Sequence, residues 1–98
     1  MRVRFSDEAR AKLRAIHGYI AQDSPRNADA MVDRITRSAQ RIGDFPRSGH
    51  KVPEYRLDAL REVLERPYRI IYRIQPDEIE IEIVTLMHYR QLLPEDLA

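Results

Sequence analysis

The chain of 98 residues contains no cysteine. Disulfides, thiolate nucleophiles and cysteine-bound zinc are therefore excluded. It also lacks any apolar run close to the ~18 residues that a transmembrane helix needs, so we expect no contact with a membrane. The first ten residues are charged from Arg2 onward and contain no apolar signal segment, which predicts a cytoplasmic protein.

An excess of charge of one sign is also missing, because the formal net charge is only +1. Residues 1–50 hold ten basic and six acidic side chains, a balance of +4, whereas residues 51–98 hold seven and ten, a balance of −3. Hydrophobic residues make up 43% of the chain, which is enough to form a core. We therefore expect one globular domain over residues 1–98, with no strong overall attraction to nucleic acid.

The first half of the chain predicts a short strand and two helices. The strand is expected at residues 3–6, and Ser6 resembles an N-cap for a helix that runs to about Gln22. Ser24 and Pro25 then mark the start of a second helix. The apolar stripe of this second helix consists of Ala28, Met31, Val32, Ile35, Ala39 and Ile42. So short a connection between helices predicts an antiparallel hairpin.

In the second half the hydrophobic period changes to two residues, which is typical of strands. After an irregular loop over residues 45–58, strands are expected at residues 60–66, 68–74 and 78–87. The tail over residues 91–98 contains a proline and is expected to be short and partly ordered.

The turn between the last two strands suggests a register. If it closes with Ile74 opposite Ile79, the pairing partner of every residue in the hairpin is fixed, and so is the face of the sheet on which its side chain lies. The remaining pairs are then Tyr72–Ile81, Ile70–Ile83, Arg73–Glu80 and Arg69–Val84.

Helices in the first half followed by strands in the second define an α+β domain with the order β-α-α-β-β-β. We expect an N-terminal strand and an antiparallel helical hairpin packed on one face of a small, mainly antiparallel sheet. Tyr68 and Tyr72 are predicted to face this core, and the opposite face of the sheet is predicted to be open. The charged residues expected on that open face are Arg69, Arg73, Glu80 and Glu82.

Several short motifs occur together in a fixed order. They are Ser24-Pro25, Phe45-Pro46-Arg47-Ser48-Gly49-His50, Val52-Pro53-Glu54, Leu60-Arg61-Glu62-Val63, Pro67-Tyr68-Arg69-Ile70-Ile71-Tyr72-Arg73, His88-Tyr89-Arg90 and Leu92-Leu93-Pro94. This set extends over nearly the whole chain and resembles the RelE/ParE superfamily of toxins from type II toxin–antitoxin systems. The helical hairpin and the run from Val52 to Arg73 are more similar to the ParE-like branch.

The resemblance implies two different activities on one fold, so the fold does not decide between them. RelE-like members are ribosome-dependent endoribonucleases, which need a base, an acid and cations around the phosphate. Matching their motifs assigns such roles to Glu54 in the loop, Arg69 in the central strand, and His88 with Tyr89 at the end of the last strand. ParE-like members poison DNA gyrase and are not known as nucleases, so whether this chain is an enzyme stays open.

The distribution of charge favours gyrase over ribosome-bound mRNA as the target. A nuclease must approach a dense array of phosphates, which favours clustered cations. The half of the chain that holds every catalytic candidate instead has a balance of −3. A protein target tolerates mixed charge. A ParE-like gyrase poison is therefore the first interpretation, and a mRNA endoribonuclease or a catalytically inactive antitoxin-binding module are the alternatives.

The resemblance also implies a cognate antitoxin that wraps the toxin with a segment that folds on binding. The expected receptors are the groove of the helical hairpin and the sheet edge near residues 60–64. The candidate partner-binding residues are Leu60, Leu64, Arg61, Arg69, Arg73 and Arg90. Arg61 alternatively pairs with Glu80 or Glu82 across the sheet. No cofactor is expected, and no metal either, because His17, His50 and His88 lack ligand spacing.

Overall fold

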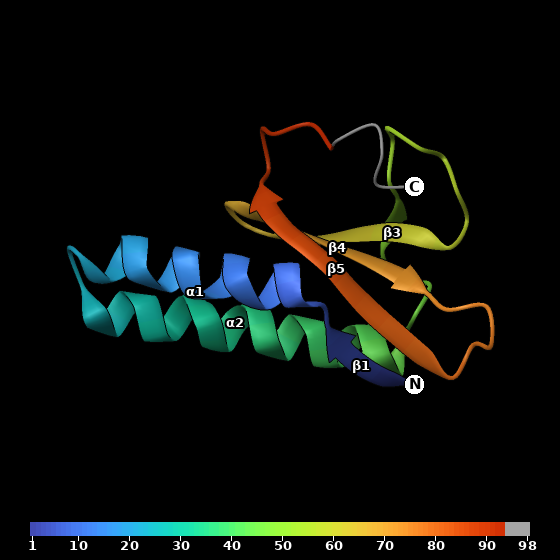
Figure 1. The fold of residues 1–98 in the computed structure, drawn as a ribbon, viewed down its shortest axis with the longest axis horizontal. Helices are drawn as coiled ribbons and strands as arrows, with labels where there is room; N and C mark the ends of the chain where they lie inside the picture. Colours follow the sequence, from blue (N-terminus) through green and yellow to red (C-terminus); the bar gives the residue numbers. More distant parts are fainter. Residues whose placement is uncertain (94–98) are drawn as a thin grey trace.

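The computed structural model describes residues 1–93. Its elements are β1 (Arg2–Phe5), α1 (Asp7–Ala21), α2 (Pro25–Asp44), β2 (His50–Lys51), β3 (Leu60–Glu65), β4 (Tyr68–Ile74) and β5 (Glu80–His88). The strands form one sheet in the order β1-β5-β4-β3-β2, in which β1 is parallel to β5 and the other neighbours are antiparallel. Figure 1 shows the two helices side by side along the sheet.

The predicted α+β order and the helical hairpin are confirmed, and β2 is an additional short strand inside the predicted loop. The prediction for the tail over residues 91–98 falls outside the described residues beyond Leu93. Within residues 1–93, neither helix is both long enough and apolar enough to cross a membrane.

Local signals determine where both helices begin. The Ser6 side chain accepts a hydrogen bond from the Ala9 N–H at 2.9 Å, and the Ser24 side chain accepts one from the Asn27 N–H at 3.1 Å. Both predicted N-caps are therefore present. Pro25 occupies the start of α2, where its missing N–H costs no helical hydrogen bond.

The main core lies between the helical hairpin and the sheet. Tyr72 is fully buried in it and Tyr68 packs against it, so the inward orientation predicted for both tyrosines is confirmed. Each fully buried large apolar side chain contributes roughly 1.5–3 kcal/mol to stability. The buried members are Ala9, Ile35, Ala39, Ile42, Ile70, Tyr72, Ile74, Ile81, Ile83 and Leu86.

The opposite face of the sheet is partly covered, so the prediction that it stays open is wrong. Val52, Leu60, Ile71 and Leu93 form a second buried cluster there. In Figure 1 the loop after β2 and the segment after β5 lie above the sheet, away from the helices. The alternation of apolar residues predicts which side chains lie on the face away from the helices, but it does not predict which segments cover that face.

The predicted register of the last hairpin is also wrong. Ile74 pairs with Ile81 instead of Ile79, because Glu78 takes a left-handed backbone conformation (φ 54°) and the turn extends to the Gln75–Glu80 hydrogen bond of 3.1 Å. A shift of two residues keeps each side chain on its predicted face.

A further irregularity changes the pairing at the far end of the same hairpin. A shift in register between Ile71 and Tyr72 adds one residue on the β5 side. Arg69 consequently lies opposite Met87, three residues beyond the predicted Val84. Arg73 lies on the turn side of the irregularity, so the longer turn alone places it opposite Glu82 instead of Glu80.

Candidate functional site

A pocket of about 470 Å³ lies on the sheet face that points away from the helices. It is built by the loop before β3, by β3 and β4, and by the segment after β5. Its lining residues are Pro53, Glu54, Glu62, Leu64, Arg69, Tyr89, Arg90, Gln91 and Leu92. Three of the four predicted catalytic residues are therefore brought together here: Glu54, Arg69 and Tyr89.

Arg69 forms the floor of this pocket and is only 5% exposed. Its Nε donates to Glu62 Oε2 at 2.7 Å, and its Nη1 and Nη2 donate to the two oxygens of Glu54 at 2.9 Å each. Nη1 also donates to the Gln91 carbonyl at 2.7 Å, and Nη2 also contacts Glu62. These contacts use all five N–H groups of the guanidinium. Arg69 is thus a saturated cation that joins three segments of the chain.

Glu54 is held as an anion by the same arrangement. The hydrogen bonds from Arg69 are the main cause that lowers the Glu54 pKa to about 2, and a further hydrogen bond comes from the Leu93 N–H at 3.1 Å. The two carboxylates in turn raise the Arg69 pKa. A carboxylate with so low a pKa is a weak base at neutral pH.

Glu62 is the member of this cluster that the sequence did not identify. Its side chain is 12% exposed and lies against Arg69, because β3 pairs with β4 so that Glu62 is opposite Ile71 and Leu64 is opposite Arg69. Alternation along β3 places Glu62 and Leu64 on one face. The alternation along β3 could be read from the sequence, but only the register of β3 with β4 places Glu62 beside Arg69.

His88 is absent from the lining of this pocket. It lines a second pocket of about 230 Å³ between α1 and the end of β5, together with Tyr19 and Tyr68. Its ring meets Tyr68 edge to face at 6.4 Å and stacks on Tyr89 at 4.8 Å. Its Nδ1 accepts a hydrogen bond from the Arg90 N–H at 3.3 Å. The fourth catalytic candidate therefore lines a different pocket from Glu54 and Arg69, although Gln91 lines both pockets.

Arg90 lies at the exposed rim of the larger pocket. Its Nε donates to the Tyr89 hydroxyl at 3.0 Å, and its guanidinium carbon lies 5.3 Å from the centre of the Tyr89 ring. Leu64 is 44% exposed at the same rim. Both predicted partner-binding residues are thus accessible.

Two other predicted partner-binding residues, Leu60 and Arg61, are buried. Leu60 is fully buried in the second cluster, so its side chain is not accessible to a partner. Arg61 is 9% exposed and donates to the Gly49 carbonyl at 2.9 Å and to Asp58 at 2.8 Å. The alternative pairing of Arg61 with the β5 glutamates is not what the structure has.

Arg4 of β1 makes the ion pairs with the β5 glutamates that were considered for Arg61. It contacts Glu80 at 3.0 Å and Glu82 at 3.1 Å, because β1 lies parallel beside β5. Arg73 is half-buried, with Leu60 and Glu82 opposite it on the neighbouring strands. Within residues 1–93, no group of three or more potential metal ligands occurs.

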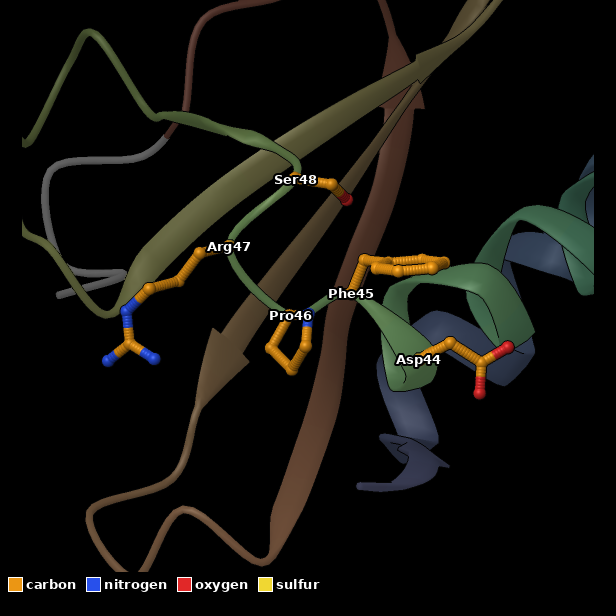
Figure 2. A pocket seen from close by; sticks show the side chains of 5 residues that line it. All are labelled: Asp44, Phe45, Pro46, Arg47 and Ser48. Carbon is orange, nitrogen blue, oxygen red and sulfur yellow. The ribbon is translucent and has the colours of Figure 1, made fainter.

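A third pocket, of about 450 Å³, lies where α2 ends. It is lined by Asp44, Phe45, Pro46, Arg47 and Ser48 (Figure 2). Phe45 is 66% exposed and its ring points toward α2, whereas the Arg47 side chain extends in the opposite direction. None of these side chains was singled out individually from the sequence.

Comparison with known proteins agrees with this architecture. A family model described as the ParE toxin of the type II toxin–antitoxin system parDE matches residues 3–93. Y4kP, a protein of Sinorhizobium fredii that is named as a toxin, is 35% identical over 98 residues, which cover 98% of this chain and 96% of that protein. The fold and these matches define a RelE/ParE superfamily toxin. More specifically, the chain belongs to the ParE toxin family of type II toxin–antitoxin systems.

Two solved structures share the fold. The chromosomal ParDE system from P. aeruginosa matches with a TM-score of 0.72 and 24% identity, over 90% of this chain and 95% of that chain. The toxin–antitoxin complex RelBE2 from Mycobacterium tuberculosis matches with a TM-score of 0.61 and 22% identity, over 89% and 95%. Both branches of the superfamily are thus represented by the same arrangement of helices and strands.

Proposed function

We propose that this chain is a ParE-like poison of DNA gyrase, acting in the cytoplasm and neutralised by a cognate antitoxin. The observation that carries the proposal is the state of Arg69, on which a nuclease would depend most. Two carboxylates and a backbone carbonyl occupy its guanidinium, so none of its N–H groups is left for a phosphate.

Admitting RNA to this pocket would be energetically costly. A phosphate bound to Arg69 would have to displace Glu54 or Glu62, whose side chains are only 19% and 12% exposed. Separating one partner of a buried ion pair costs about 3–5 kcal/mol. The displaced carboxylate would then also repel the phosphate. A protein target requires no such opening.

Proton transfer to or from RNA has little support from these groups. Glu54, with a pKa of about 2, is a poor general base at neutral pH. His88 lies in the other pocket and stacks on Tyr89. The base, the acid and the phosphate-binding cation that RNA cleavage needs are therefore not assembled around one point.

A RelE-like ribosome-dependent endoribonuclease is the second candidate, because Glu54, Arg69 and Tyr89 do line one pocket. Purified gyrase and purified ribosomes distinguish the two functions. We expect the wild-type protein to inhibit supercoiling by gyrase and to leave mRNA intact during translation. Normal supercoiling together with mRNA cuts that disappear in Tyr89→Phe would contradict the proposal and support the nuclease. Antitoxin binding without either effect would indicate an inactive binding module.

We also propose that the antitoxin binds at two adjoining places. The first is the pocket between α1 and β5, where Tyr19 is 73% exposed. The second is the outer edge of β3, because β2 pairs with Arg61 and Glu62 but extends no further along the described part of β3. An extended segment of the antitoxin could add a strand at that edge.

Hydrogen exchange of the free toxin and of its complex with the antitoxin tests this placement. We expect new protection in α1 and at residues 63–65, and little change around residues 44–48. Protection confined to the loop after α2 would contradict the placement without bearing on gyrase.

A further inference from the structure

The loop after α2 presents a large aromatic side chain next to a hollow. Phe45 is 66% exposed, and the pocket of about 450 Å³ lies beside it (Figure 2). Buried aromatic anchors supply much of the binding energy of protein interfaces. A single exposed apolar residue is common on protein surfaces, so the backbone that carries it and the charges around it decide whether it is an anchor.

The backbone of this loop is fixed by two buried side chains. The Tyr72 hydroxyl donates to the Pro46 carbonyl at 2.6 Å and accepts from the Gly49 N–H at 3.1 Å. Arg61 Nη1 donates to the carbonyls of Gly49 at 2.9 Å and Arg47 at 3.3 Å. Phe45 is therefore displayed on a preorganised loop, which lowers the entropy cost of binding a partner.

The charges around Phe45 are of both signs: the Met1 ammonium donates to the Gly43 carbonyl at 2.8 Å, and Arg41 lies in the last turn of α2. Arg47 contacts Glu78 at 2.9 Å and Asp58 at 3.9 Å, so its charge is largely compensated. Asp44 lines the pocket, and no ion pair connects it to any other residue among 1–93. A surface with an aromatic ring, a carboxylate without an ion pair and cations beside it has the mixed charge that suits a protein partner, and it offers no cluster of cations for nucleic acid.

This loop lies at the opposite end of β5 from the antitoxin surface proposed above. The contact between Arg47 and Glu78 ties it to the turn where β5 begins, whereas His88 at the other end of β5 lines the pocket next to α1. Nine residues of strand separate these ends by about 27 Å. Figure 1 shows the end of α2 and the β4–β5 turn on the same side of the molecule.

We propose that Phe45 and Asp44 form the surface by which the toxin docks on its protein target, separately from the antitoxin. Phe45 inserts into an apolar cavity of the target, and basic residues around that cavity contact Asp44. The inference rests on the proposed function and deepens it, since an enzyme that handles DNA carries basic surfaces of this kind.

Two variants and a matched control test the inference. Phe45→Ala removes the anchor and Asp44→Arg reverses the charge, while Tyr19→Ala removes an aromatic ring of similar exposure (73%) from the α1 pocket. We expect Phe45→Ala to lower growth arrest and gyrase inhibition at least about tenfold, and Asp44→Arg to lower both by less. Antitoxin affinity should stay within about twofold of wild type for both variants, and only Tyr19→Ala should weaken it. Thermal unfolding of each purified variant, in complex with the antitoxin, confirms folding.

The outcomes distinguish the docking role of Phe45 from the proposal that gyrase is the target. Growth arrest by Phe45→Ala equal to wild type, or a loss of antitoxin affinity in this variant, overturns the inference while leaving the gyrase proposal intact. If the wild-type toxin spares gyrase but its growth arrest still requires Phe45, the gyrase proposal fails and the docking role of the loop is supported.

Discussion

Arg69 joins two segments of the chain to the centre of the sheet. Through Glu54 it holds the loop before β3, and through the Gln91 carbonyl it holds the segment after β5. Glu54 also accepts from the Leu93 N–H, which fixes Leu93 in the second buried cluster. Arg69, a phosphate-binding candidate in the sequence, thus holds the two segments that cover the second face of the sheet.

Replacing Glu54 tests this structural role. Glu54→Gln keeps the size of the side chain but removes the charge, so we expect a loss of about 1–3 kcal/mol in the free energy of unfolding, measured with urea. Glu80→Gln is the matched control, because Glu80 pairs with Arg4 at the surface and such pairs contribute less than about 1 kcal/mol. Equal effects of the two substitutions would argue against a special role for the Arg69 cluster.

The depressed pKa of Glu54 predicts how stability depends on pH. Its value falls from 4.5 to about 2 in the folded state, mainly through the hydrogen bonds from Arg69. A carboxyl group with a lowered folded pKa stabilises the fold above its unfolded pKa, and this contribution is lost as pH falls toward the folded value. We therefore expect urea unfolding to show a decline in stability between pH 4.5 and about 2 that is shallower in Glu54→Gln. Parallel pH profiles for the two proteins would contradict the assignment.

At the scale of elements, the helices were predictable because their signals are local. Ser6 and Ser24 cap the helices that follow them, and the cap needs only residues within the first turn. The strand pairs depend on distant geometry instead. The left-handed conformation of Glu78 and the irregularity at Ile71 moved the hairpin register by two and then three residues. The position of Glu62 beside Arg69 depends on the β3–β4 register, so the site was predicted only in part.

Two glycine substitutions test how tightly the loop after α2 packs against the sheet. A Cβ on Gly49 would lie 2.6 Å from both the Glu62 carbonyl and the Tyr72 hydroxyl, whereas a Cβ on Gly18 meets nothing within 4 Å. Gly49→Ala should therefore cost about 1–3 kcal/mol through overpacking. Gly18→Ala, in the exposed part of α1, should gain up to about 1 kcal/mol. Urea unfolding checks both, and a neutral Gly49→Ala would show that the loop is looser than its hydrogen bonds indicate.

At the scale of the whole molecule, the sheet separates two kinds of surface. One face packs on the helical hairpin, and the other is closed by the Arg69 cluster and by the segments that it holds. The pockets beside α1 and β3 lie toward one end of β5, and the loop that exposes Phe45 lies toward the other. The mixed charge could be read from the composition, but the separation of these surfaces follows from the fold.

We propose that this toxin acts on gyrase while Arg69 stays bonded to Glu54 and Glu62. The most direct measurement incubates purified gyrase, supercoiled DNA and ATP with increasing amounts of the toxin, and follows DNA breaks that gyrase fails to reseal. We expect breaks that increase with toxin, disappear when the antitoxin is added, and persist in Tyr89→Phe. Unbroken DNA and normal supercoiling at every toxin concentration, from a preparation that arrests growth in cells, would contradict it.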